Sequence, residues 1–136
     1  ILLSGHAKNV SFETVQQNIV SCGGINTLKK GTAPGMRKNL DLDESLFDWS
    51  IYYCGNGLMD VSELLIVKSD NSAALETAEK AAASRLDAQK TNFDGYGTNQ
   101  IDLLGHAITK KVGPYYFYAV SEHASTWEEV FMGLVK

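Results

Sequence analysis

The chain has 136 residues, of which 44% are hydrophobic and 21% charged, with a formal net charge of −4. We expect a chain of this length to form one domain, residues 1–136, that buries enough surface for its own core. The mild negative charge argues against a nucleic-acid partner, because it offers no basic footprint. No apolar run approaches the ~20 residues of a transmembrane helix.

The first residues hold a short apolar segment, Ile1 to Gly5. Leu-Ser-Gly precedes the lipid-modified cysteine of bacterial lipoproteins, but the next residue is His6, so no lipidation site is present there. We interpret the segment as an apolar lead-in or a first strand. Because the chain begins with isoleucine rather than methionine, we expect a processed or trimmed product.

The N-terminal third predicts one short helix followed by an irregular stretch. Ser11 is a good N-cap, and apolar residues from Phe12 to Cys22 recur at helical spacing until Gly23-Gly24 ends the helix. Ile25–Ser45 is interpreted as a long loop with a helical turn near Met36.

The middle of the chain predicts a β-hairpin and a long helix. Leu46–Cys54 alternates apolar and polar residues, whereas Val61–Lys68 contains a continuous apolar run, typical of a strand buried on both faces. The glycines between them favour a hairpin connection. Ala73–Asn92 then predicts a helix, capped by the preceding polar residues, with an apolar stripe at three- and four-residue steps.

The last third repeats this order. We expect a strand from about Leu104 to Val112, a turn, a second strand over Tyr115–Ser121 and a helix over Thr126–Val135. Ser125 and Glu128 form a capping box at the start of that helix.

This order predicts an α+β fold: a four-stranded, mainly antiparallel sheet built from two ββα units, with an additional N-terminal helix. We expect the two later helices to lie on the same face of the sheet. Tyr115–Ser121 carries aromatic side chains on both faces, so the second face also needs a cover. We favour the N-terminal helix and the loop 25–45 over a second copy of the chain or a partner.

Several segments match a known family in order and spacing. They are Ser62-Glu63 at a strand start, Arg85 and Gln89 in the helix, Phe93-Asp94-Gly95-Tyr96 at its exit and Gly113-Pro114-Tyr115-Tyr116 in the second hairpin. Over roughly residues 10–135 the chain resembles DUF4358, a family of extracytoplasmic domains found mostly in lipoproteins of Gram-positive bacteria. The resemblance implies an extracytoplasmic location and a precursor that can be membrane-anchored, but no biochemical activity.

No pattern of catalytic, cofactor-binding or metal-ligating residues is present. The nucleophile motifs, phosphate loops and Cys-x-x-Cys are missing, and an Asp41-Leu42-Asp43 calcium loop fails because Leu46 and Tyr52 replace its glycine and glutamate. We therefore assign no catalytic residue, metal or cofactor.

The cysteines and histidines leave some questions open. Cys22 and Cys54 are free buried thiols or a disulfide. We place His106 in a strand as a structural histidine and His123 in solvent, and nothing in the sequence brings His106 to Cys54.

Glu63, Arg85 and Tyr96 are the candidate binding residues. A carboxylate at the start of a buried strand is costly unless it is paired, and Arg85 lies beside the apolar stripe of the helix. We predict a mostly buried ion pair, which is either a structural feature or the lining of a small anion or peptide site. The Tyr96 hydroxyl can close either arrangement.

Two classes of function remain. The first is a non-enzymatic cell-envelope module that binds a protein, peptide or glycan through its aromatic sheet. The second is a small hydrolase or transferase with an unrecognised catalytic constellation. The lack of any nucleophile–base spacing favours the first, and a cleft that joins Cys54 or His106 to a carboxylate would favour the second.

Overall fold

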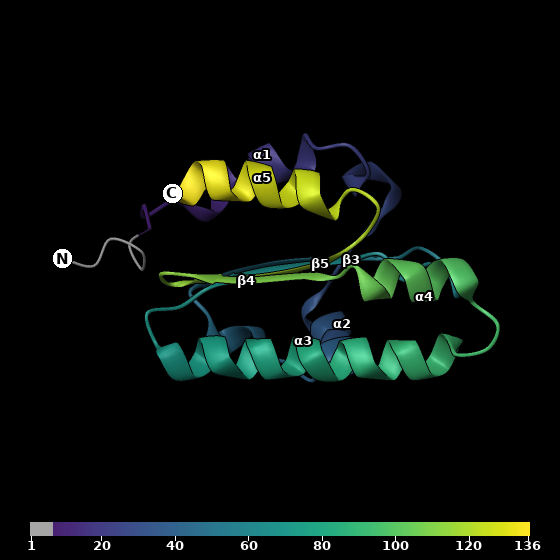
Figure 1. Cartoon of the computed structure of the whole chain (residues 1–136). Helices are drawn as coiled ribbons and strands as arrows, with labels where there is room; N and C mark the ends of the chain where they lie inside the picture. Colours follow the sequence, from purple (N-terminus) through teal and green to yellow (C-terminus); the bar gives the residue numbers. More distant parts are fainter. Residues whose placement is uncertain (1–6) are drawn as a thin grey trace.

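The computed structural model describes residues 7–136, so the apolar segment and His6 lie outside the described residues. A five-stranded antiparallel sheet, in the order β1-β2-β3-β5-β4, lies between two layers of helices (Figure 1). The elements in chain order are α1 (Phe12–Val20), η1 (Ile25–Thr27), β1 (Lys29–Lys30), α2 (Ala33–Leu40), η2 (Glu44–Leu46), β2 (Trp49–Cys54), β3 (Glu63–Lys68), α3 (Ser72–Phe93), α4 (Thr98–Gly105), β4 (Ile108–Val112), β5 (Tyr115–Val120) and α5 (Ala124–Val135).

The central strand, β3, forms the middle of the core. β3 pairs with β2 on one side and with β5 on the other, and Leu64 to Val67 are fully buried. The predicted burial of β3 on both faces is therefore confirmed, as are the two antiparallel hairpins β2–β3 and β4–β5. The α+β class is also confirmed, but the sheet has five strands rather than four because Lys29–Lys30 adds a short edge strand beside β2.

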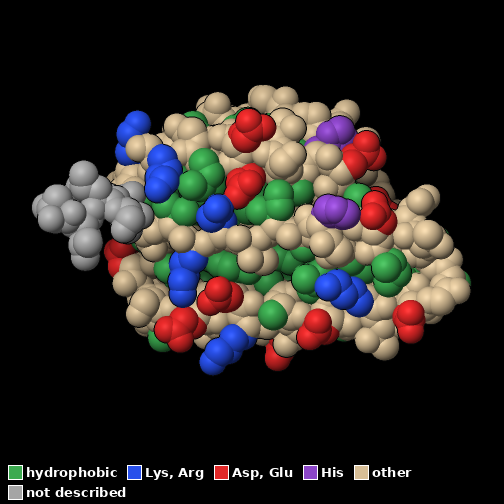
Figure 2. All heavy atoms as spheres, in the orientation of Figure 1, with side chains coloured by type: hydrophobic (Ala, Val, Ile, Leu, Met, Phe, Trp, Pro, Cys, Tyr) green, Lys and Arg blue, Asp and Glu red, His purple; other side chains and the backbone are tan. Residues whose placement is uncertain are grey.

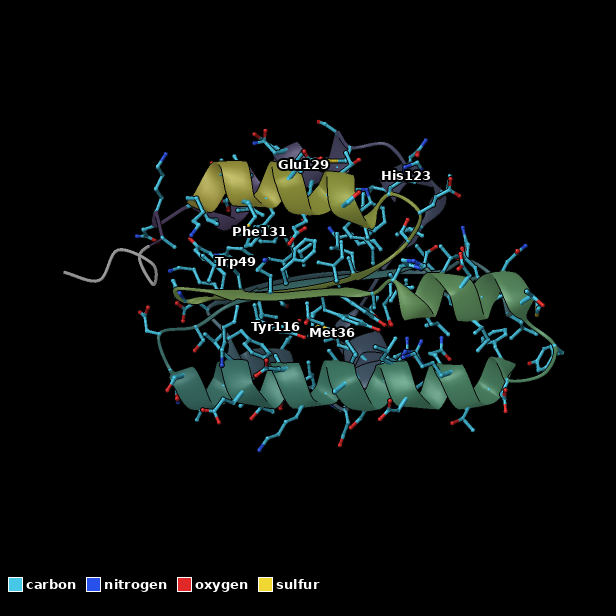
Figure 3. All side chains as sticks on the ribbon, in the orientation of Figure 1. Met36, Trp49, Tyr116, His123, Glu129 and Phe131 are labelled. Atoms are coloured by element: carbon cyan, nitrogen blue, oxygen red, sulfur yellow. The ribbon has the colours of Figure 1, made fainter. Side chains whose placement is uncertain are left out.

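One face of the sheet is covered by α3 and α2. Asn71 caps α3, and small residues of this helix, Ala78 and Ala82, are fully buried against the sheet. Because alanine side chains are short, the helix axis approaches the strands closely. Tyr116 and Tyr118 of β5 are buried in this layer, and Figure 3 shows Tyr116 between the sheet and α3.

The opposite face is covered by α1 and α5. Phe117 stacks on Phe131 with ring centroids 5.4 Å apart, and the Trp127 indole nitrogen donates to the Gly23 carbonyl at 2.9 Å. The expectation that α3 and α5 share a face is wrong. β5 is apolar on both faces, so each face requires its own helix, and the two hairpin-linked helices divide between them (Figure 1).

The favoured cover of the second face is confirmed only in part. The N-terminal helix α1 does lie there, but beside α5, whereas the stretch predicted as a loop contributes α2 to the opposite, α3 layer. The helical turn expected near Met36 is thus a complete eight-residue helix, capped by Thr32.

Three local predictions are wrong. The strand predicted from about Leu104 begins only at Ile108, because Leu104 belongs to helix α4, in which it is buried and which packs on α3. His106 consequently lies at the exposed end of α4, outside any strand. Ser125 lies within α5, whose N-cap residue is His123.

The surface around edge strand β4 mixes charges of both signs (Figure 2). Lys110 pairs with Glu128 of α5 at 3.6 Å, and Lys111 pairs with Glu79 of α3 at 3.5 Å. Lysines on an edge strand oppose pairing with another sheet. Within residues 7–136, no helix combines the length and the hydropathy needed to cross a bilayer.

Candidate functional site

The candidate site lies where the end of β2, the start of β3 and the middle of α3 meet. Glu63 is the first residue of β3, opposite Cys54, and its side chain points into the α3 layer. Only 1% of Glu63 is exposed. A carboxylate buried to this extent requires charged or hydrogen-bonding partners.

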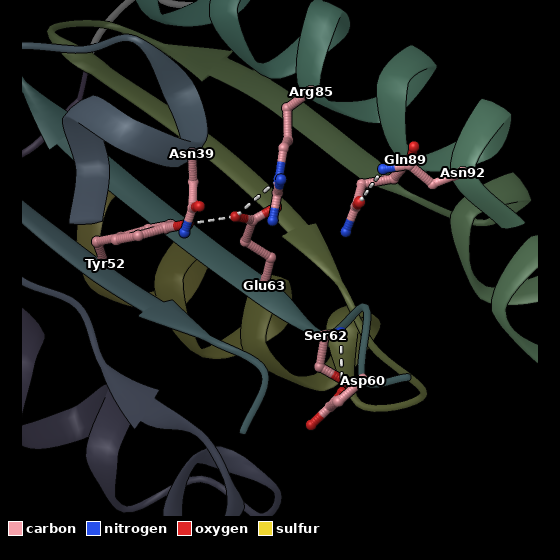
Figure 4. Close-up of polar contacts among 8 residues, drawn as sticks. All are labelled: Asn39, Tyr52, Asp60, Ser62, Glu63, Arg85, Gln89 and Asn92. Atoms are coloured by element: carbon pink, nitrogen blue, oxygen red, sulfur yellow. Dashed lines mark hydrogen bonds and ion pairs between the residues drawn. The ribbon is translucent and has the colours of Figure 1, made fainter. Parts of the chain in front are cut away.

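Glu63 has two such partners, which form a connected chain of polar groups (Figure 4). Arg85 Nε of α3 donates to Glu63 Oε1 at 3.1 Å and to Oε2 at 3.2 Å. The Tyr52 hydroxyl of β2 donates a short hydrogen bond to Glu63 Oε2 and accepts one from Asn39 Nδ2 at 3.1 Å. The predicted buried ion pair between Glu63 and Arg85 is confirmed.

Burial and charge shift the pKa values of this cluster. Burial raises the pKa of Glu63, and the nearby Arg85 and Tyr52 oppose that rise. Burial favours the neutral form of Arg85, but the Glu63 carboxylate outweighs it and the arginine pKa is raised. Burial, followed by the charge of Glu63, raises the pKa of Tyr52. Tyr52 therefore stays protonated and can donate to Glu63.

Beside this cluster lies a cavity of about 650 Å³, called here the Arg85 cavity. Its polar lining comprises Asn39, Asp60, Ser62, Arg85, Gln89 and Asn92. Arg85 lines the cavity, and among the described residues its hydrogen bonds are made through Nε alone, so its two terminal nitrogens are left as donors without a partner there. A volume of this size is typical of sites for small ligands.

A second lining residue, Gln89, offers a donor group. Asn92 Nδ2 donates to Gln89 Oε1 at 3.3 Å, which fixes the orientation of the Gln89 amide. The Gln89 nitrogen is turned away from Asn92 (Figure 4), and Gln89 and Arg85 both line the cavity. Arg85, Gln89 and Asn92 lie on one face of α3, because they are spaced four and three residues apart.

Exposed apolar side chains form the rim of the cavity. Leu58 and Met59 of the β2–β3 loop are 97% and 51% exposed, and Tyr96 after α3 is 66% exposed. A hydrogen bond of 2.8 Å from Gln100 Nε2 to the Met59 carbonyl connects this loop to α4.

Gly55 starts the same loop, and a Cβ there would lie 2.2 Å from the Asp60 carbonyl oxygen. Only glycine permits this close turn, and Asp60 completes it by accepting from the backbone amides of Asn56 and Ser62. The loop that carries the rim is therefore held at both ends.

The structure brings Glu63 and Arg85 together but places Tyr96 on the rim. Tyr96 packs against Phe93 with ring centroids 5.7 Å apart, and the hydroxyl that reaches Glu63 belongs to Tyr52 instead. Strand alternation could have identified Tyr52. In the hairpin Cys54 lies opposite Glu63, and Tyr52, two residues earlier in β2, points to the same face of the sheet.

Two clefts bring a cysteine or a histidine together with a carboxylate, which is the arrangement that would favour an enzyme. Cys54 and Asp60 both line the Arg85 cavity, but burial and then Glu63 raise the pKa of the Cys54 thiol, which opposes formation of the nucleophilic thiolate. His106 lies in a separate cavity beside Asp102, with 78% of its side chain exposed. Neither arrangement provides an activated nucleophile.

The two cysteines lie on opposite faces of the sheet and do not form a disulfide. Cys54 packs against the α3 layer and Cys22 against the α1–α5 layer, and both thiols are free. Among residues 7–136 there is no group of three His, Cys, Asp or Glu side chains that could hold a metal. Asp43 instead caps η2 by accepting from the Ser45 amide.

Comparisons with known proteins give one result. No curated protein and no solved structure matches the chain significantly. A family model described as "Domain of unknown function (DUF4358)" matches residues 21–121, a span that includes the whole sheet, α3 and the Arg85 cavity. The chain therefore belongs to the DUF4358 family.

Proposed function

We propose that this protein is a non-enzymatic, extracytoplasmic binding module whose ligand site is the Arg85 cavity. The observation that carries the proposal is the guanidinium group of Arg85. Its Nε donates to a buried carboxylate, its terminal nitrogens make no hydrogen bond among the described residues, and the residue lines a cavity of about 650 Å³. Such an arrangement presents hydrogen-bond donors in a fixed position before any ligand arrives.

The energetics of the buried pair support a role in binding. Replacing a buried ion pair with apolar residues of similar volume is often neutral or stabilising, so stability alone gives little reason for this pair. Glu63 and Tyr52 do, however, fix the position of Arg85. A donor group that is fixed before binding loses less conformational entropy when the ligand binds, and affinity increases accordingly.

The aromatic sheet is not the binding surface that we expected. All six residues of β5 are buried, and helices cover both faces of the sheet. Three of the six large hydrophobic side chains that are exposed among the described residues line the Arg85 cavity instead, which is why we assign ligand binding to that end of the molecule.

The extracytoplasmic location is part of the proposal and rests on the resemblance of the sequence to lipoprotein domains. Fractionation of cells that express the full-length gene tests it, with a tag at the C-terminus. Recovery with the envelope is expected, whereas recovery with the cytoplasmic fraction would contradict this part of the proposal.

Ligand binding is tested by NMR on the isotope-labelled chain with a panel of small probes. The panel contains acetylated peptide amides, neutral disaccharides and aliphatic carboxylates. We expect at least one class to shift the side-chain amide signals of Gln89 and Asn92 and to be recovered chemically unchanged. Asn18, whose amide lies on the exposed side of α1, is the internal control. Equal shifts at Asn18, no shifts with any class, or conversion of a probe would contradict the proposal.

A further inference from the structure

We infer that the ligand of the Arg85 cavity is a peptide segment with an apolar side chain, and this inference rests on the proposed function. Its backbone carbonyl groups accept hydrogen bonds from Arg85 and Gln89, and its side chain packs on the rim formed by Leu58, Met59 and Tyr96.

Two lining residues of the Arg85 cavity offer hydrogen-bond donors. Arg85 has terminal nitrogens that make no hydrogen bond among the described residues, and Gln89 has an amide nitrogen that is not used in its hydrogen bond with Asn92. A ligand that fits must therefore present acceptors there. Peptide carbonyl oxygens are strong, neutral acceptors with two lone pairs each, so one carbonyl can accept from both side chains.

The charges that line the Arg85 cavity favour a neutral ligand. The positive charge of Arg85 is compensated by Glu63 at 3.1 Å, and Asp60 adds a further carboxylate to the lining. A phosphate or a carboxylate would therefore enter a site without net positive charge. A neutral acceptor avoids this repulsion, and the lining consequently favours a peptide group over an anion.

The rim of the Arg85 cavity favours a ligand with an apolar side chain. Of the six large hydrophobic residues that are exposed in the described chain, three line the Arg85 cavity and a fourth, Ile101, lies with Tyr96 in the adjoining hollow. Such clustering of apolar side chains marks an interaction site. A hydroxyl-rich sugar would leave the aliphatic chains of Leu58 and Met59 in water, whereas an apolar side chain of a peptide would cover them.

The inference is tested by NMR titration of the full chain with acetylated pentapeptide amides that differ only in the central residue. Leucine, serine and aspartate are compared, with cellobiose as a neutral sugar. We expect the leucine peptide to bind about tenfold more tightly than the serine peptide, from partial burial of one apolar side chain. A leucine peptide with N-methylated amides, which keeps all its carbonyl acceptors, is the control for the shape of the peptide backbone.

Two variants locate the binding. Leu58→Ser changes a side chain that is almost fully exposed, so the fold is retained, and we expect it to remove most of the preference for leucine. Val20→Ser, at an exposed apolar position of α1, is the matched control and should leave the preference unchanged.

The possible results separate the inference from the proposed function. If cellobiose or the aspartate peptide shifts Gln89 and the leucine peptide does not, the ligand class is wrong while the cavity remains a binding site. If the leucine peptide binds equally well to Leu58→Ser, the rim does not recognise the side chain and the inference is wrong. If none of the probes shifts Gln89 or Asn92, both the inference and the proposed function are contradicted.

Discussion

Removing Arg85 should destabilise the protein more than removing Glu63. Only 2% of the Glu63 side chain is exposed, against 21% for Arg85, which borders the cavity. Arg85→Met leaves a buried carboxylate without its cation, at a cost of ~3–5 kcal/mol. Glu63→Gln leaves a guanidinium that can reach water in the cavity, so its cost should be smaller, ~1–3 kcal/mol. The Glu63→Gln/Arg85→Met double variant should lose less than the two single changes together, because neither charge is left alone.

The measurement is urea unfolding followed by circular dichroism at neutral pH. The midpoint should fall for Arg85→Met without a change in the m-value, and its melting temperature should drop by on the order of 10–20 °C. An Arg85→Met variant within about 0.5 kcal/mol of the natural chain would refute the reasoning, because the carboxylate would then have found another partner or solvent.

The same variant should show a characteristic pH dependence. Burial raises the pKa of Glu63 in the folded state, and Arg85 opposes that rise. Without Arg85 the folded-state pKa should rise further above the unfolded value. The folded state then binds more protons than the unfolded state between these two pKa values, so stability decreases as pH rises through that window. The deficit of Arg85→Met relative to the natural chain should therefore be smaller at about pH 4 than at pH 7.

Two further pairs of variants test the packing around the site. Tyr52→Phe removes the hydroxyl that donates to Glu63 and should cost ~1.5–3 kcal/mol in urea unfolding, whereas Tyr118→Phe removes a buried hydroxyl without a partner among the described residues and should be neutral or stabilising. A loss for Tyr118→Phe as large as that for Tyr52→Phe would contradict this difference. Ala82→Leu should cost ~1–3 kcal/mol because α3 lies directly on the sheet there, and Ala83→Leu, on the exposed side of the same helix, should stay within about 0.5 kcal/mol. Equal melting temperatures for these two variants would mean that α3 is not packed as described.

The local predictions succeeded where one signal dominated the sequence. The continuous apolar run of β3 and the helical stripe of α3 each have one arrangement that buries them, and both elements lie within a few residues of their predicted bounds. The ion pair followed from the same reasoning, since a carboxylate at the start of a buried strand needs a cation nearby.

The prediction that failed most clearly concerned how the helices divide between the faces. A helix that follows a hairpin can return over either face, and the local sequence does not specify which. β5 contained the decisive information, because Tyr116 and Phe117 are adjacent and must both be buried. We had noted this pattern but assigned the second cover to the N-terminal helix and loop alone, whereas α5 supplies much of it.

The cavity could not be predicted, because its parts come from distant segments. Asn39, Cys54 and Gln89 line one cavity only after α2, the hairpin and α3 have packed together. Their individual patterns are those of an ordinary loop, strand and helix. The α4 helix was missed for a related reason: its short apolar stretch around Leu104 fits either a strand or a helix, and packing against α3 decides between them.

The most direct test of the binding site observes the guanidinium group of Arg85 by nitrogen-detected NMR during titration with the leucine pentapeptide. The Nε–H group donates to Glu63, whereas the terminal N–H groups make no hydrogen bond among the described residues, and Arg85 lines the cavity. We expect the terminal N–H signals to shift and their exchange with water to slow as the peptide saturates, while the Nε–H signal stays in place. Saturation of the protein with no change in the terminal signals would contradict the assignment of the Arg85 cavity as the ligand site.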